Sequence, residues 1–331
     1  MEQLEDKIFN AAYYNFDEVA LEIFSFQYHN NELYRNYVDA IGINIGSVDN
    51  IEKIPFLPIS FFKTHEVKTT DFNPEIVFES SGTTGANTSR HLVKTASLYR
   101  KSFLKTFNHF YGRPAQWCIL ALLPGYLERE NSSLVYMVNN LVQKSVQNGS
   151  GFYLHEHDKL YQALVKNEIT QKPTLLIGVT YALLDFAQKY SLKLQNTIVM
   201  ETGGMKGKRE EITREEVHTE LKKQLGLSAI HSEYGMTELL SQAYSKGHGV
   251  FFCPPWMKIV LREYNDPFAV KAVAYNKKPF SGLINIIDFA NLFSCSFIAT
   301  DDVGRLHPDN SFEVMGRRDM SDMRGCSLLT L

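Results

Sequence analysis

Hydrophobic and polar positions follow two different periods through the middle of the chain. Short apolar runs rich in β-forming residues recur there, at 117–123, 174–180, 197–201 and 228–234. Amphipathic stretches with helical spacing lie between them, at 133–145, 158–168 and 181–191. Strands that alternate with helices in this way are typical of a mainly parallel sheet with helices on its faces. The pattern therefore predicts an α/β core.

One helix can be bounded closely from the sequence. Thr213 and Glu216 have the spacing of a capping box, in which each side chain bonds the backbone of the other. A stripe of apolar residues four positions apart follows, made of Val217, Leu221 and Leu225. Gly226 is expected to end the helix, because glycine readily adopts the left-handed conformation found there. We expect the many charges of this segment to form a solvated helix face.

The pattern changes on both sides of this core. Residues 1–72 predict helices and loops, punctuated by Pro55 and Pro58. After about residue 247, strand-like runs separated by turn residues predict a β-rich section. We expect one compact body without a long linker, in four parts: a helical segment (1–72), the α/β core (73–246), a β-rich subdomain (247–315) and a hinge-like tail (316–331).

Composition narrows the classes of function. The net charge is −3 over 331 residues, which gives no general attraction to nucleic acid or anionic membranes. The N-terminus lacks the basic start and apolar core of a signal peptide, and no run approaches the roughly 20 apolar residues that span a bilayer. Four widely spaced cysteines without a CxxC pair indicate neither a disulfide framework nor a zinc ribbon. We therefore expect a cytoplasmic protein.

The stretch SSGTTG, residues 80–85, is the first candidate for chemistry. Glycines and small hydroxyl residues in succession let backbone N–H groups converge on an anion, and the hydroxyls add further donors. The lysine of a Walker-type loop is missing, and so is a GxGxxG fingerprint. From these residues alone, a plain turn and a phosphate-binding loop both stay open.

Three later stretches give the loop a context: ETGGMKGK (201–208), HSEYGMTELLSQ (231–242) and ATDDVGRLHPDNSFEVMGRRDMSDMRG (299–325). Their order after SSGTTG resembles the adenylate-forming superfamily of acyl-CoA synthetases, peptide-synthetase adenylation domains and luciferases. The resemblance covers residues 80–325, about three-quarters of the chain. Within that superfamily ALLPGYLERENSSLVYM, ETGGMKG and the ending RGCSLL are similar to the LuxE-type acyl-protein synthetases.

The resemblance implies a fold and a reaction. The fold would be the large N-terminal α/β domain of these enzymes, without their small C-terminal domain, and the core would bind a nucleotide. Family members activate a fatty acid with ATP and hold the acyl group as a thioester on a cysteine near the C-terminus. Cys326 occupies that position here. An acyl reductase, an acyltransferase or a carrier protein would be the partner.

The resemblance also assigns roles around the nucleotide. The loop that cradles the pyrophosphate end of ATP would be made of Ser80, Ser81, Gly82, Thr83, Thr84 and Gly85. The family often continues with Pro-Lys, whereas Ala86 and Asn87 follow here, so the first cation is Arg90. Gly203 and Gly204 would let the backbone approach adenine and the acyl group.

The later motifs supply the remaining groups. By resemblance Tyr234 would stack on adenine, and Thr237 would contact the α-phosphate. Glu238 would hold Mg²⁺, a hard cation suited to carboxylate and phosphate oxygens. Asp302 would bind the ribose hydroxyls, although Asp301 stands where the family usually has glycine. Ribose or phosphate would be contacted by Arg317, with Arg324 as a second cation that could also lower the pKa of the Cys326 thiol.

Two points stay open at this stage. The larger relatives continue past the GRxD motif into a domain of roughly 100 residues that supplies a lysine for adenylation, whereas this chain stops at Leu331. The cation would then come from Arg90, Lys206, Lys208 or a partner. Two other functions remain: a ligase that uses the external thiol of coenzyme A or a carrier protein, and a scaffold that binds adenylate without catalysis.

Overall fold

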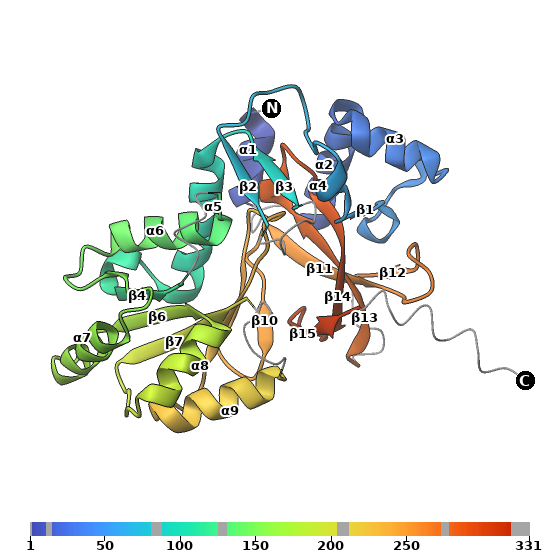
Figure 1. Cartoon of the computed structure of the whole chain (residues 1–331). Coiled ribbons are helices and arrows are strands. Elements are labelled where there is room, and N and C mark those ends of the chain that lie inside the picture. The colour runs from blue at the N-terminus through green and yellow to red at the C-terminus, as the bar shows by residue number, and fades with distance from the viewer. Residues whose placement is uncertain are drawn as a thin grey trace, which may run out of the picture.

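A computed structural model gives the structure of the chain, and it describes residues 2–10, 15–80, 88–124, 131–203, 212–272 and 278–318. Figure 1 shows helices around one large twisted sheet, with the N-terminal helices beside the C-terminal strands. Among the described residues, no helix is both long and apolar enough to span a bilayer.

The N-terminal elements pack on the end of the chain, and they also meet the core that follows them, where the Phe62 ring lies edge-on to His91. They are α1 (Glu2–Phe9), α2 (Phe16–Asn30), α3 (Glu32–Ala40), two 3-10 turns (Ile45–Ser47 and Ile51–Lys53), β1 (Leu57–Pro58) and α4 (Phe61–Thr64). Strand β1 pairs in parallel with a C-terminal strand, Leu57 opposite Ile298. The buried amide of Gln27 donates to the carbonyl oxygens of Asn291 and Leu292 at 3.1 and 2.9 Å. This segment is therefore fastened to the predicted β-rich section.

The central part confirms the predicted alternation of strands and helices. It consists of the hairpin β2 (Ile76–Glu79) and β3 (Arg90–Val93), followed by α5 (Ala96–Tyr111), a 3-10 turn (Pro114–Gln116), β4 (Cys118–Leu122), α6 (Ser133–Ser145), β5 (Gly151–Phe152), α7 (His157–Ile169), β6 (Thr174–Val179), α8 (Thr180–Lys189), β7 (Thr197–Thr202), α9 (Arg214–Leu225) and β8 (His231–Tyr234). Every residue of β4 and β6 is buried. Such continuous apolar runs are typical of parallel strands covered on both faces.

The C-terminal part is β-rich, as predicted. Its elements are β9 (Ala243–Ser245), β10 (Val250–Phe252), β11 (Met257–Arg262), β12 (Val270–Lys271), β13 (Phe280–Asp288), a 3-10 turn (Phe289–Asn291), β14 (Phe297–Leu306) and β15 (Phe312–Arg317). In the part of the chain that the structure describes, all strands except β2 and β3 belong to one sheet, in the order β12-β11-β13-β14-β15-β10-β9-β8-β7-β6-β4-β5, with β1 beside β14.

The sheet changes character at β8. Strands β4 to β8 pair in parallel, and each pair from β8 to β12 along the sheet is antiparallel. In Figure 1, α5 and α6 lie on one side of β4, β6 and β7, and α8 and α9 lie on the other. The boundary predicted after residue 246 falls between β9 and β10, which pair with Phe251 opposite Ser245. One sheet therefore runs through both predicted sections.

Helix α9 confirms the predicted caps. Thr213 Oγ1 accepts a hydrogen bond from the Glu216 backbone N–H at 3.2 Å, and the Glu216 carboxylate accepts one from the Thr213 N–H at 2.7 Å. Gly226 follows the helix with a φ of 65°. A Cβ at this position would lie 2.9 Å from the Cα of Lys193. Both conformation and space therefore require glycine.

We expect Gly226→Ala to lower the free energy of unfolding by about 1–2 kcal/mol, because the left-handed conformation costs an L-residue about that much. The contact with the Lys193 backbone adds to this loss. Urea denaturation followed by circular dichroism measures the change. Gly151→Ala is the matched control, because a Cβ there meets no atom within 4 Å and the φ of Gly151 is not positive. Equal midpoints for the two variants would contradict the prediction.

Candidate functional site

Two of the predicted motifs meet at one edge of the sheet. Strand β7 ends at Thr202 and is followed by Gly203, and β8 ends at Tyr234 and is followed by Gly235. The strands are adjacent and parallel, with Thr202 opposite Glu233, and the Thr202 hydroxyl donates to the Glu233 carboxylate. Ligands of open α/β sheets bind outside the carboxyl ends of the strands. This edge is therefore the candidate site.

A small cavity of about 120 Å³ opens at this edge. Gly203 and Thr237, which belong to different motifs, both line it. Glu79, from the end of β2 where the SSGTTG loop begins, lines it as well. The structure thus brings two of the predicted sequence motifs to one place, together with the strand that leads into the third.

Tyr234 and Asp302 are in direct contact, although 68 positions separate them. The Tyr234 hydroxyl donates to Asp302 Oδ2 at 2.8 Å, and Arg317 Nε lies 3.4 Å from Asp302 Oδ1. Burial raises the pKa of Asp302, and the bond from Tyr234 and the charge of Arg317 only partly oppose this. The ring of Tyr234 is 9% exposed and lies edge-on to Phe251 and Phe312. Its packing and its hydroxyl bond fix the position of Asp302.

Asp301 points away from this group. Neighbouring residues of a strand face opposite sides of the sheet, and Asp301 lines a separate cavity against the N-terminal segment. Of the two successive aspartates, Asp302 is therefore the one that joins Tyr234 and Arg317.

Strand β3 is tied to the YGMTE motif by His91, which the sequence analysis did not single out. His91 is 1% exposed; its Nδ1 lies 2.9 Å from the carbonyl oxygen of Thr237, and its Nε2 lies 2.8 Å from the hydroxyl of Ser294. A carbonyl only accepts, so Nδ1 carries the proton and Nε2 accepts from Ser294. Burial lowers the pKa of His91 to about 4, which keeps the ring neutral at neutral pH.

Glu238 is the last residue of the same YGMTE motif. Its side chain is buried, with 6% of the residue exposed, and its backbone oxygen accepts from Asn291 Nδ2 at 2.7 Å. Burial raises the pKa of its carboxyl, and a hydrogen bond with Ser89 opposes the shift without cancelling it. No group of three or more potential metal ligands gathers among the described residues. One carboxylate still fits Mg²⁺, which is often held by one or two carboxylates together with substrate phosphates.

The base of the SSGTTG loop is well defined. The Ser80 N–H donates to the Ser89 carbonyl at 3.0 Å, and the Ser89 N–H donates to Ser80 Oγ at 2.9 Å. Arg90, predicted as the first cation after the loop, has its Nε 3.9 Å from Glu79 Oε1. Their side chains are 49% and 42% exposed, and the two residues pair at the end of the β2–β3 hairpin from which the loop extends.

A buried chain of polar contacts supports Gly203 from behind, and the sequence analysis did not find it. Thr180 Oγ1 lies 2.6 Å from the Gly203 carbonyl and 3.1 Å from Glu201 Oε2. Glu201 Oε1 lies 3.6 Å from both His218 Nε2 and Arg214 Nε. Burial would raise the pKa of Glu201, but His218 and Arg214 hold it below its ordinary value. The charged carboxylate therefore anchors the end of β7.

Three of the four cysteines lie within the described residues. Cys118 and Cys295 are fully buried, and burial raises the pKa of Cys295 to about 12. Cys253 is half-buried, and the burial of its thiol raises the pKa of that thiol strongly. A thiol reacts as the thiolate. None of these three thiols is suited to accept an acyl group.

Several predicted residues lie outside the described ranges. They are Ser81, Gly82, Thr83, Thr84, Gly85, Gly204, Arg324 and Cys326, together with Lys206, Lys208 and the GRxD aspartate Asp319. Their roles stay predictions.

Because the His91 ring is neutral in the fold, stability should fall in acid. Between about pH 4 and pH 6.5, the His91 ring binds a proton in the unfolded chain, where its pKa is 6.5, but not in the folded protein, where its pKa is about 4. The contribution of the neutral His91 ring to the free energy of unfolding is fully present above pH 6.5 and is lost as the pH falls toward 4. We expect the difference in unfolding free energy between wild type and His91→Gln to shrink by about 2–3 kcal/mol from pH 7 to 4.5. Urea titrations measure it, and pH profiles that stay parallel would contradict it.

Comparison with known proteins identifies the family and the fold of the chain. A family model described as "Acyl-protein synthetase, LuxE" matches residues 5–330. A protein of Vibrio harveyi, described as a long-chain-fatty-acid–luciferin-component ligase, is 24% identical over an alignment of 331 residues that covers 92% of this chain and 84% of that protein.

Solved structures show the same fold. ATP-bound MatB from Rhodopseudomonas palustris has a TM-score of 0.55 at 14% identity, over 75% of this chain and 50% of that one. The long-chain-fatty-acid-CoA ligase FadD1 from Archaeoglobus fulgidus has a TM-score of 0.50 at 13% identity, over 73% of this chain and 51% of that one. The predicted fold class is confirmed, and the chain spans about half the length of these solved structures.

Proposed function

The chain belongs to the LuxE family of acyl-protein synthetases, and we propose that it activates a long-chain carboxylic acid with ATP and transfers the acyl group to the thiol of Cys326. The substrate class is taken from the family and from the Vibrio harveyi relative. The acceptor is inferred from the sequence position of Cys326, from the burial of Cys118 and Cys295, and from the raised pKa of the half-buried Cys253.

The first step makes the acid reactive. A carboxylate oxygen attacks the α-phosphorus of ATP, an O–P bond forms, and the bond to the β-phosphate breaks to release pyrophosphate. The product is an acyl-adenylate, whose leaving group is a stable phosphate ester. Negative charge develops on the phosphates, so positioned donors and cations are expected to carry most of the catalysis. Thr237, Arg90 and the loop at 80–85 are the groups we assign to them.

The second step moves the acyl group to sulfur. The thiol gives its proton to solvent, and the thiolate attacks the acyl carbon. The C–S bond forms, the C–O bond to the phosphate breaks, and AMP leaves with the bonding electrons. We assign Arg324, two positions before Cys326, to lowering the pKa of the thiol.

The single observation that carries the proposal is the contact of Asp302 with Tyr234 and Arg317. A carboxylate fixed in this way is suited to accept hydrogen bonds from the two hydroxyls of a ribose. We assign the base of the nucleotide to the side of Tyr234 and of the backbone that follows β7. Glu238 would hold Mg²⁺, which screens phosphate charge when it is bound.

The experiment that tests the proposal is ATP–pyrophosphate exchange with a panel of carboxylic acids, followed by intact mass of the protein. We expect exchange that requires a long-chain acid, and a mass increase equal to the acyl group that hydroxylamine removes. Exchange without a protein adduct, with turnover restored by coenzyme A or a carrier protein, would support an external thiol. No exchange with any acid would leave a non-catalytic adenylate-binding scaffold.

An acyl group bound to a protein thiol is passed on to an acceptor. We propose that an acyl reductase, an acyltransferase or a carrier protein takes it from Cys326. Incubation of the acyl-enzyme with each class of acceptor, followed by the loss of the mass adduct, measures this transfer.

A further inference from the structure

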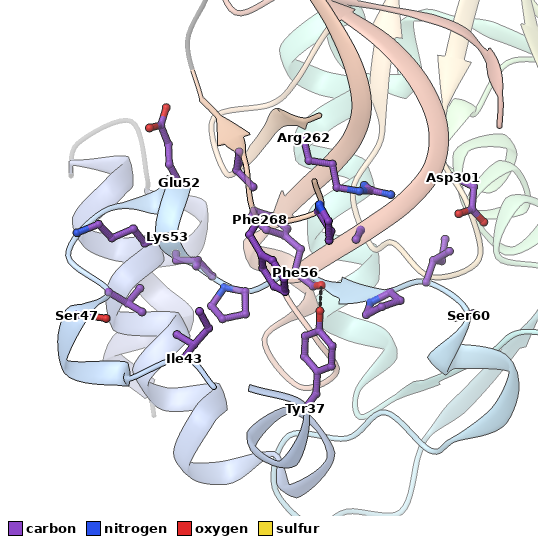
Figure 2. A pocket seen from close by; sticks show the side chains of 18 residues that line it. Tyr37, Ile43, Ser47, Glu52, Lys53, Phe56, Ser60, Arg262, Phe268 and Asp301 are labelled. Atoms are coloured by element: carbon purple, nitrogen blue, oxygen red, sulfur yellow. Dashed lines mark hydrogen bonds between the residues drawn. The ribbon is translucent and has the colours of Figure 1, made fainter. Parts of the chain in front are cut away.

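A second cavity, larger than the one at the strand edge, lies between the N-terminal segment and the β-rich section. Its volume is about 360 Å³, within the roughly 300–1,000 Å³ that is usual for small-molecule sites, whereas the cavity beside Gly203 measures about 120 Å³. Figure 2 shows Phe56, Phe268 and Arg262 near its middle, with Asp301 and Ser60 toward one end and Glu52 and Lys53 toward the other. Of its 18 lining residues 12 are apolar or aromatic, and the charged ones are Glu52, Lys53, Arg262 and Asp301.

The chemistry of the wall favours an uncharged occupant. Arg262 is the cation nearest the middle of the cavity in Figure 2. Its guanidinium already donates to Ile284 O at 3.2 Å, to Thr300 O at 2.6 Å and to the side chain of Asn285. Phe268 is 56% exposed, so an aromatic face is left for a ligand to cover. These features suit a hydrocarbon chain better than an anion.

The cavity and the proposed nucleotide site share one short stretch of chain. Asp302 faces Tyr234, and Asp301, the residue before it, lines the cavity. Arg317 Nε lies 3.4 Å from Asp302 Oδ1, whereas the Arg318 N–H donates to the Asp301 carbonyl at 2.8 Å. Arg318 also donates to the Tyr264 carbonyl at 3.2 Å. The chain that leads to Cys326 therefore leaves from between the two sites.

Cys326 follows eight positions after Arg318, the last residue that the structure describes. From position 318 to position 326 the chain spans at most about 28 Å when it is fully extended. Because Arg317 pairs with Asp302 and Arg318 is bonded to Asp301, this segment starts beside both the proposed nucleotide site and the cavity.

We propose that this cavity receives the hydrocarbon chain of the acyl group after its transfer to Cys326. This inference rests on the proposed function. A thioester on an exposed segment would leave its chain in water, and each methylene that moves into an apolar cavity favours the buried state about fourfold. Held in this way, the thioester is kept from water attack on its carbonyl carbon, which would break the C–S bond and release the acid and the free thiol. The acyl-enzyme therefore persists until an acceptor consumes it.

The first test measures hydrolysis of the acyl-enzyme after ATP and free acid have been removed. Intact mass is followed with time for wild type, Ala299→Phe and Phe268→Ser. Ala299 is half-buried and lines the cavity, so phenylalanine there fills it, and Phe268→Ser removes the exposed aromatic wall. We expect both variants to lose a long-chain acyl group at least about fourfold faster than wild type, the effect of one methylene. Phe252→Ser is the matched control, because Phe252 is 45% exposed and does not line the cavity.

Equal hydrolysis rates in wild type and both cavity variants would overturn the inference and leave the proposed function intact. If wild type forms no acyl-enzyme, the proposed function fails and the inference fails with it. Should Ala299→Phe not fold, Phe268→Ser still decides, because its side chain is mostly exposed.

The second test locates the chain directly. Wild type is acylated with a fatty acid that carries a diazirine at its terminal carbon, irradiated, and analysed by peptide mapping. We expect cross-links within residues 43–60 and 262–270, which line the cavity. Cross-links confined to residues 202–237 would place the chain at the strand edge instead and overturn the inference.

Discussion

Replacing Cys326 by alanine is expected to abolish the stable acyl-enzyme while ATP–pyrophosphate exchange continues. Exchange needs only the first step, in which the acid attacks ATP, whereas the adduct needs a thiolate acceptor. The other thiols cannot substitute, because Cys118 and Cys295 are buried and burial raises the pKa of Cys253 strongly. Intact mass after incubation with ATP and a long-chain acid should show an adduct of less than about 1% of the wild-type level, since the removed nucleophile is essential to the second step.

Ser327→Ala is the matched control for this experiment, because it changes the adjacent residue without removing a thiol. We expect it to acylate as wild type does. A hydroxylamine-labile acyl group on Cys326→Ala would mean that another nucleophile is the acceptor. Loss of both exchange and adduct in Cys326→Ala would mean that the cysteine serves the first step or the fold.

Asp302→Ala should lower kcat/KM for ATP about 100-fold or more. The carboxylate is the acceptor that we assign to the ribose, and hydrogen bonds to a charged group contribute about 1.5–3 kcal/mol each. Its removal also leaves the hydroxyl of Tyr234 without its acceptor and Arg317 without its counter-charge. Initial rates of exchange at varied ATP concentration measure the loss.

Asp309→Asn serves as the control for this variant, because Asp309 lies in the turn between β14 and β15 and accepts hydrogen bonds from the N–H and the hydroxyl of Ser311. It should change kcat/KM by less than about threefold, as surface substitutions usually do. Tyr234→Phe keeps the carboxylate and removes its buried donor. Its kcat/KM for ATP should therefore lie between those of Asp302→Ala and Asp309→Asn. An Asp302→Ala protein with unchanged kinetics for ATP would remove the ribose assignment.

The sequence predicts well what depends on local patterns. The capping box of Thr213 and Glu216 and the stop at Gly226 involve residues close together in the chain, and the structure confirms each of them. The buried strands β4, β6 and β7 also follow from apolar runs alone, because both of their faces are covered. Motif order then indicated the fold class, which the comparisons confirm.

What the sequence could not predict depends on long-range packing. The bond between His91 and Thr237 joins β3 to a segment 146 positions later, and no periodicity marks either residue. The contact of Glu201 with His218 depends on α9 packing behind β7, a tertiary arrangement. Strand β1 has two residues, too few for a pattern, and it is fixed only by its pairing with β14.

The predicted division into four parts stays a prediction. The sheet changes from parallel to antiparallel pairing at β8, ahead of the change in sequence pattern near residue 247. Hydrogen bonding nevertheless continues across that change, and the N-terminal segment closes on the last strands. The sequence pattern indicates which residues form strands, whereas the fold determines which strands pair with one another.

The most direct measurement of the central claim uses a long-chain acid labelled with ¹⁸O in its carboxylate. If the acid attacks the α-phosphorus and sulfur then displaces the phosphate, one labelled oxygen passes from the acid to AMP. The account predicts AMP heavier by one ¹⁸O, in amounts equal to the acyl groups found on the Cys326 peptide. Unlabelled AMP, or ADP and phosphate as the products, would contradict it.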